Sequence, residues 1–129
     1  MELFDPERVA AAANADPEFQ LASRFWTTSI RIDIGETPLL LKVTDGRVER
    51  FSELNESEAR ESPWTYRISA PAVDWTQFLE PVPKPFYQDL MAGVYRHGFV
   101  LEGDESEFYP HYSAADRLFA IARSVAATS

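Results

Sequence analysis

The feature that most constrains the fold is a pair of alternating segments joined by a two-residue turn. Every second position is apolar in residues 28–34 and again in residues 38–44, which predicts strands with one buried face. These positions are Ile30, Ile32 and Ile34, then Leu39, Leu41 and Val43. Asp45-Gly46 follows, and this dipeptide tolerates the positive φ of a tight hairpin. Val48 and Phe51 then continue a third strand, so the chain is expected to build an antiparallel sheet here.

Two helix starts precede this hairpin. Asp5-Pro6-Glu7 and Asp16-Pro17-Glu18 each combine a capping carboxylate, a proline at the first position and an acid in the first turn. They predict a helix to about Ala13 and a second helix with the apolar face Phe19, Ala22, Phe25 and Trp26. Of these two helices, we expect the second, which carries the apolar face, to pack against the rest of the chain. Residues 1–15 are therefore assigned to an N-terminal helical arm, and residues 16–129 to a single domain.

The segments after the hairpin predict a fourth strand and two further helices. Residues 54–62 are acidic and polar, typical of a solvated loop or a short exposed helix, and Trp64, Tyr66 and Ile68 restore a strand period. We expect Ser69 to cap a short helix with Pro71 in its first turn. Its inner face is Trp75, Phe78 and Leu79. The spacing from Ser113 to Asp116 predicts a capping box for the last helix. Its apolar residues are Ala115, Leu118, Phe119, Ala122 and Val125.

Residues 79–104 form the central stretch. Three prolines (Pro81, Pro83 and Pro85) restrict its backbone, and we expect a helix with Pro85 near its first turn. Its apolar stripe is Phe86, Leu90, Met91, Val94 and Tyr95. Gly98 is expected to be a left-handed C-terminal cap, and Phe99–Leu101 a short buried strand. This surface is either plain core or the wall of an apolar cavity.

Together these elements predict an α+β fold. We expect a five-stranded, mostly antiparallel twisted sheet covered on one face by about five helices.

Composition excludes several functional classes. A net charge of −9 argues against a general nucleic-acid binder and against attachment to anionic lipid surfaces. The chain has no cysteine, which removes disulfides, thiol catalysis and thiolate zinc sites. A basic, then apolar signal segment and a run of membrane-spanning length are both missing. We therefore expect a cytoplasmic protein without stable membrane insertion.

The catalytic inventory is small. The two histidines are His97, at the end of the central helix, and His111, in a Tyr-Pro-His-Tyr turn. Paired with Asp104 or Glu102, His97 could act as a general base, but we favour a helix-end histidine bonded to backbone carbonyls. Tyr95 is a second weak acid/base candidate. No HExxH spacing, glycine-rich phosphate loop or GxSxG elbow occurs, so we assign no catalytic residue, metal site or cofactor.

Large apolar side chains are the remaining candidates for a functional site. Close packing absorbs such residues in most proteins. Rings, a pliable methionine and tyrosines with polar tips also suit an apolar pocket with a few hydrogen bonds. The candidate ligand-binding residues are Trp26, Leu41, Trp64, Trp75, Phe78, Phe86, Leu90, Met91, Val94, Tyr95, Phe99, Leu118 and Phe119.

The order of elements resembles the sterol carrier protein type-two family. The resemblance extends from about Asp16 to Val125 and rests on Ile68-Ser69 followed by Leu79, and on Gly98, Leu101 and Gly103-Asp104. The second glycine is one residue closer than in the family pattern, and Leu101 is displaced. The resemblance implies an apolar tunnel between sheet and helices for lipids, sterols or acyl chains. It also implies a last helix beside the tunnel mouth and no catalytic residues.

We therefore predict non-catalytic binding or transfer of a hydrophobic ligand such as a fatty acid, an acyl-CoA or a sterol-like metabolite. Two alternatives stay open. One is a small enzyme that uses His97 or Tyr95 in the same cavity. The other is an interaction domain, with a homodimer as the simplest form.

Overall fold

The predicted hairpin forms around Asp45 and Gly46, whose φ angles of 50° and 81° are the positive values that the turn requires. Its strands belong to a five-stranded sheet of order β3-β2-β1-β4-β5. Neighbours pair antiparallel except β1 and β4, which are parallel. The strands are β1 (Thr28–Ile34), β2 (Thr37–Thr44), β3 (Arg47–Glu53), β4 (Tyr66–Ala70) and β5 (Val100–Gly103). The computed structural model describes residues 3–85, 87 and 89–128, and for residue 95 the backbone alone.

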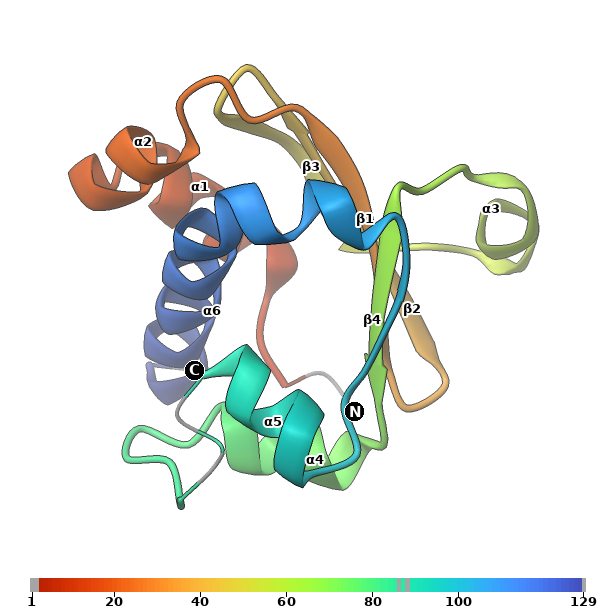
Figure 1. Cartoon of the computed structure of the whole chain (residues 1–129), viewed down its shortest axis with the longest axis vertical. Helices are drawn as coiled ribbons and strands as arrows, with labels where there is room; N and C mark the ends of the chain where they lie inside the picture. Colours follow the sequence, from red (N-terminus) through yellow and green to blue (C-terminus); the bar gives the residue numbers. More distant parts are fainter. Residues whose placement is uncertain (1–2, 86, 88, 129) are drawn as a thin grey trace.

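Most of the helices cover one face of this sheet (Figure 1). On that side lie α1, α2, α4, α5 and α6, whereas the short α3 lies on the other side. The helices are α1 (Pro6–Asn14), α2 (Pro17–Ser23), α3 (Glu56–Glu61), α4 (Ala72–Phe78), α5 (Leu90–Arg96) and α6 (Tyr112–Ala127), with the 3₁₀ turns η1 (Glu105–Glu107) and η2 (Tyr109–His111). The predicted α+β class is confirmed, with the sheet mostly antiparallel.

Both N-terminal helices dock, whereas we expected only the second to do so. Val9 and Ala13 of α1 are fully buried, as is Phe19 of α2. The Asn14 amide also pairs with the edge strand β3: its Nδ2 donates to the Val48 carbonyl at 3.0 Å, and its Oδ1 accepts from the Val48 N–H at 2.9 Å. An edge strand exposes backbone groups that need such partners. The described part of the predicted arm 1–15 therefore shares one hydrophobic core with the other described residues.

The second helix is shorter than predicted. It ends at Ser23, so Phe25 and Trp26 lie beyond it. Phe25 has a positive φ of 68° and is 82% exposed. Trp26 is nevertheless buried, because the chain turns there and leads it under the start of β1. The predicted apolar helix face was therefore right about the burial of Trp26 and wrong about that of Phe25.

Two predicted helix caps are wrong. Ser69 lies inside β4, where it pairs with Val100 of β5, and Pro71 stands at the N-cap of α4. Ser113 lies inside α6, which begins at Tyr112. The turn η2 runs directly into α6, so the helix starts from an already coiled backbone and carries no side-chain cap there.

The central helix begins later than predicted. Asp89 caps α5 by accepting a hydrogen bond from the Ala92 N–H at 2.8 Å, so the helix starts at Leu90 and not near Pro85. A carboxylate cap outweighs the mild preference of proline for a first turn. Gly98 is also not left-handed, since the glycines with positive φ are Gly35, Gly46 and Gly103. A Cβ at Gly98 would lie 2.6 Å from the Asp74 Oδ2, so close approach explains the glycine.

The strand β5 is an edge strand and not a buried one. It begins at Val100, which is 51% exposed, and Leu101 is half-buried. Phe99 is buried but precedes the strand. Pairing with β4 on one side alone leaves this strand at the border of the sheet, which accounts for its exposure.

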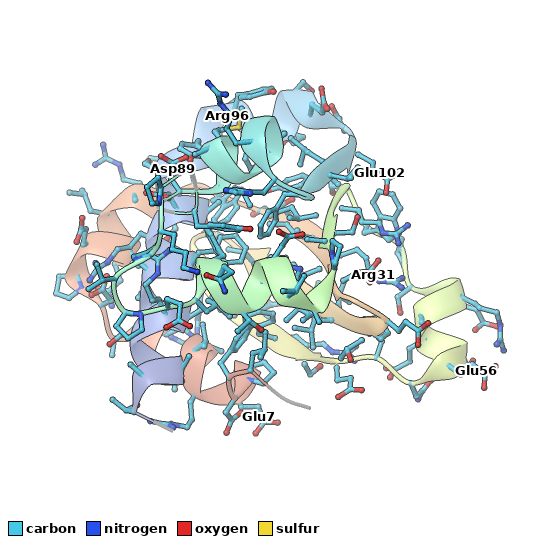
Figure 2. The ribbon with its side chains drawn as sticks, turned by 90° about the horizontal axis from the view of Figure 1, so that it is seen from below. Glu7, Arg31, Glu56, Asp89, Arg96 and Glu102 are labelled. Atoms are coloured by element: carbon cyan, nitrogen blue, oxygen red, sulfur yellow. The ribbon has the colours of Figure 1, made fainter. Side chains whose placement is uncertain are left out.

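The outer face of the sheet is organised around Asp33. This carboxylate is 5% exposed and pairs with Arg31 at 2.8 Å and with Arg67. Arg31 also donates to the Ala59 carbonyl of α3 at 2.9 Å, and Figure 2 shows Arg31 on the side of the sheet where α3 lies. The buried Asp33 carboxylate is thus paired with two guanidinium groups. The side chains of Ile30, Ile32, Leu39, Leu41 and Val43 face the opposite side and belong to the main core, whereas Leu40, opposite Arg31, lies on the outer face.

We predict that Asn14→Ala destabilises the fold. The substitution removes both side-chain hydrogen bonds to Val48, and the free energy of unfolding should fall by about 1–3 kcal/mol. Urea unfolding followed by circular dichroism measures this change. Gln20→Ala removes only an exposed hydrogen bond to the Asn14 carbonyl, and should cost less than about 0.5 kcal/mol. Equal losses in the two variants would contradict the assignment.

A second prediction concerns acid stability. Hydrogen bonds from Arg117 (2.8 and 2.9 Å) and from the Phe19 N–H (2.7 Å) lower the pKa of Asp16 from its ordinary value of 3.8 to about 2. A carboxyl with a lowered folded-state pKa stabilises the fold above about pH 3.8, and this contribution is lost as the pH falls toward 2. Arg117→Met should raise the pKa of Asp16 and make acid unfolding begin at higher pH.

Carbon-detected NMR titration of the Asp16 carboxyl and circular dichroism between pH 5 and pH 2 would measure both effects. Arg60→Met, which breaks an exposed ion pair to Glu56 on α3, is the control and should leave both unchanged. An unaltered Asp16 titration in Arg117→Met would refute the assignment.

Candidate ligand-binding site

Four buried aromatic rings form the centre of the layer between sheet and helices. We call Trp75, Phe78, Phe99 and Phe119 the aromatic cluster. The Trp75 ring centroid lies 4.8 Å from that of Phe99, 5.8 Å from Phe78 and 5.7 Å from Phe119. Phe78 lies 5.4 Å from Phe99 and 5.6 Å from Phe119. These separations are typical of direct ring contact. The cluster therefore joins α4, the residue before β5, and α6.

The predicted hollow beneath the central helix is occupied here by Phe99. A Cβ at Gly93 of α5 would stand 2.8 Å from the Phe99 ring, so the helix rests directly on this side chain. Leu90 of α5 is fully buried beside the same core, and Met91 and Val94 pack against it while half-buried. A ligand that enters below α5 must displace Phe99.

Arg123 of α6 binds the backbone before and after the three prolines Pro81, Pro83 and Pro85. Its guanidinium donates to the Phe78 carbonyl at 2.9 and 2.6 Å and to the Tyr87 carbonyl at 3.4 Å. The same group lies 5.1 Å from the Phe78 ring centroid, and burial lowers the pKa of Arg123. These contacts hold the chain on both sides of the prolines to α6. The sequence carries no signal for this role, because the partners are backbone carbonyls far away in the chain.

His97 also contacts the chain after the prolines. Its ring stacks on Tyr87 at 3.5 Å, and its Nε2 lies 3.4 Å from the Pro85 carbonyl. The Tyr87 hydroxyl donates to Asp74 at 2.8 Å, and burial together with this bond raises its pKa. These contacts agree with the favoured interpretation of His97 as a helix-end histidine beside a backbone carbonyl.

The pairing of His97 with Asp104 or Glu102, by which His97 could have acted as a general base, does not form. Asp104 instead caps η1 by accepting from Ser106, and Glu102 lies 3.6 Å from Arg67. Within the described residues no group of three or more His, Asp or Glu side chains is arranged to hold a metal ion.

A cavity of about 310 Å³ opens at one end of the layer. Its wall comes from the end of β1, the start of β2, the end of β3 and the segment before α1. The lining residues are Leu3, Phe4, Pro6, Ile34, Thr37, Leu39 and Glu53. Leu3 also lines a second hollow of about 200 Å³ between α4 and the end of α6. The N-terminal segment thus separates two openings at the border of the apolar layer.

The predicted ligand-binding residues divide into four groups. The buried ones are Trp26, Leu41, Trp75, Phe78, Leu90, Phe99, Leu118 and Phe119. Met91 and Val94 are half-buried, and Trp64 is 37% exposed before β4. Phe86 and the side chain of Tyr95 lie outside the described residues. The structure brings the aromatic cluster together, places Trp26 at the other end of the layer beside Phe19 and His111, and leaves Trp64 out of the interior.

Sequence reasoning missed the lining of the open cavity. Ile34 and Leu39 were predicted correctly on the inner face of the sheet. Their position in the cavity wall depends on where β1 ends and β2 begins, which the alternating pattern does not show. Phe4 carried a signal that could have found it: an apolar residue directly before an N-cap, with Val9 four residues after that cap, is the pattern of a hydrophobic staple. Both residues are buried in the same cluster.

Comparison with known proteins identifies the fold. No family model and no curated protein matches the sequence. A crystal structure of sterol carrier protein 2 superposes with a TM-score of 0.72 at 19% identity, covering 93% of this chain and 94% of that chain. The solution structure of a conserved hypothetical protein from Thermus thermophilus, described as possibly a sterol carrier protein, has a TM-score of 0.72 at 20% identity and covers 97% and 90%.

A third solved structure, described as a UbiJ-SCP2 ubiquinone synthesis protein, has a TM-score of 0.58 at 16% identity and covers 88% of this chain and 86% of that chain. At these identities the likeness establishes the fold. The chain has the sterol carrier protein 2 fold, so the predicted resemblance to that family is confirmed at the level of the fold. Within the described residues, no helix has the length and apolar character needed to cross a bilayer.

We predict that Gly93→Ala destabilises the chain. Alanine is the better helix former by about 1 kcal/mol, but its Cβ would press on the Phe99 ring. Because Trp75 and Phe78 hold that ring, the net result should be a loss of about 1–3 kcal/mol. Urea unfolding of Gly93→Ala, Phe99→Leu and the double variant forms a cycle. Gly93→Ala should cost less in the Phe99→Leu background. An equal cost in both backgrounds would show that this contact is not responsible.

Proposed function

We propose that this protein binds an apolar, lipid-like small molecule in the layer between its sheet and α4, α5 and α6. The observation that carries the proposal is the open cavity at the end of that layer, lined mainly by apolar side chains, in a chain with the sterol carrier protein 2 fold. A volume of about 310 Å³ is at the lower end for small-molecule sites. A longer ligand therefore has to continue from the cavity into the layer.

The packing suggests how the ligand enters. The cavity and the hollow beside α4 share Leu3, so displacement of the N-terminal segment joins them. From there an alkyl chain would run along the inner face of β1 and β2 and under the aromatic cluster, with Phe99 moving away from α5. Burying about 300 Å² of ligand surface contributes roughly 7 kcal/mol, from which the cost of moving these side chains is subtracted. The binding should therefore be reversible, as a carrier requires.

The test is displacement of an uncharged fluorescent naphthylamine dye by long-chain lipids. Thr37→Trp fills the mouth of the cavity and should weaken binding at least about tenfold, because the bulky ring occupies the entrance. Thr44→Trp is the matched control, since it introduces the same ring on the same strand but at its far end, on the outer face. It should bind as the unmodified chain does.

Equal binding by the two variants would exclude the cavity as the entrance. Failure of the unmodified chain to take up the dye or any lipid would refute the proposed function. Mass spectrometry of an organic extract of the purified protein would name the ligand that it carries.

A further inference from the structure

Four buried polar atoms in one region of the interior have no hydrogen-bond partner among the described residues. They are the Trp26 Nε1, the Thr28 Oγ1, the Tyr66 hydroxyl and the His111 Nδ1. Trp26, Thr28 and Tyr66 are between 0% and 6% exposed. Buried polar atoms in folded proteins are nearly always paired. Several unpaired ones together therefore indicate a partner that the chain itself does not supply.

The sheet brings two of these residues side by side. Thr28 is the first residue of β1 and Tyr66 the first of β4, and these strands run parallel with Ile30 opposite Tyr66. Thr28 and Ile30 are two positions apart, so their side chains face the same, inner side. Trp26 lies two residues before Thr28, on the segment that enters β1. All three therefore stand where β1 and β4 begin.

The turn η2 closes the same region from the helical side. The His111 ring stacks on Trp26 with 5.8 Å between the centroids. Phe108 packs edge-on against Tyr66 at 5.4 Å and accepts a hydrogen bond from the His111 N–H at 3.3 Å. In Figure 1 the starts of β1 and β4 and the turn η2 all lie at the upper end of the layer. We call Trp26, Thr28, Tyr66 and His111 the polar end.

We infer that the polar end binds a neutral oxygen, a hydroxyl or carbonyl group at the tip of an otherwise apolar ligand. The inference rests on the proposed function and adds the chemistry of the ligand head. The indole of Trp26 can only donate, and the hydroxyls of Thr28 and Tyr66 can donate or accept. An oxygen with two lone pairs accepts from two of these donors at once. The rest of the layer offers the aromatic cluster and aliphatic side chains for the tail.

The charges around the polar end argue against a carboxylate head. Burial raises the pKa of Tyr66 and the charge of Glu107 raises it further, so this hydroxyl stays protonated and Glu107 would repel an anion. The ion pairs formed by the described residues include none of the four residues of the polar end. None of the four residues is a lysine or an arginine, so a carboxylate buried there would lack the permanent positive charge that usually accompanies a buried anion.

The polar end and the open cavity lie at opposite ends of β1. Thr28 and Ile34 are six residues apart, which corresponds to about 20 Å along a strand. A ligand with its oxygen at the polar end would therefore extend its tail toward the cavity. This separation selects molecules with one terminal oxygen and a long apolar body.

The test compares dodecanol, dodecane and dodecanoate as competitors of the uncharged dye on the full chain at pH 7, each delivered from cyclodextrin. Dodecanol should compete at about tenfold lower concentration than dodecane. Thr28→Val and Tyr66→Phe each remove one hydroxyl with little change of shape. Each should reduce the preference for dodecanol over dodecane at least about threefold and leave the binding of dodecane unchanged. Tyr112→Phe is the matched control, because the Tyr112 hydroxyl bonds to Met91 and Asp89 away from the polar end, and it should keep the full preference.

The two variants should fold normally, since each deletes an atom that has no partner, and circular dichroism checks this. Three results would overturn the inference while leaving the proposed function intact. These are tighter binding of dodecanoate than of dodecanol, equal binding of dodecanol and dodecane, or variants that weaken both alike. If none of the three competitors binds while longer lipids do, the inference also fails. If no lipid of any kind binds, both fail.

Discussion

The fold depends on Trp75, because this residue joins the middle of the sheet to the helical layer through both a hydrogen bond and ring contacts. Its indole N–H donates to the Asp33 carbonyl of β1 at 2.9 Å, and its ring contacts three other aromatic side chains. The Asp33 carboxylate meanwhile is held on the opposite face by Arg31 and Arg67. One residue of the central strand therefore anchors the helices through its backbone and the outer charge network through its side chain.

Local patterns made the hairpin, the strands and most of the core predictable. Asp45-Gly46 determines its own turn, because few other residues accept positive φ at both positions. The inward positions of β1 and β2 follow from a period of two that needs no knowledge of the partner strand. The buried face of α6 followed equally from its helical spacing. In each case the information lies within a few residues of the feature it predicts.

The errors arose where a distant partner decides the local structure. Gly98 is required by the approach of Asp74 and Pro71, and not by its own φ. Ser69 resembles a cap in the sequence, but pairing with Val100 keeps it in a strand. The parallel pairing of β1 with β4 spans two strands and a helix, and no nearby residue signals it. The polar end depends on this pairing, which explains why Thr28 and Tyr66 were not among the predicted site residues. The open cavity depends instead on how the N-terminal segment packs beside the ends of β1, β2 and β3.

The interior differs chemically between the two ends of β1. At the Ile34 end a cavity opens beside Leu3, and its wall combines apolar side chains with Thr37 and Glu53. At the Thr28 end the interior is closed by rings and contains polar atoms without partners. An interior that was plain core would gain stability from apolar residues at Thr28 and Tyr66, because unpaired polar atoms carry a desolvation cost without a compensating bond. Four of the five such atoms among the described residues lie at this end, the fifth being the Gln77 Oε1 of α4, and this concentration supports the proposed binding of an amphipathic ligand in one orientation.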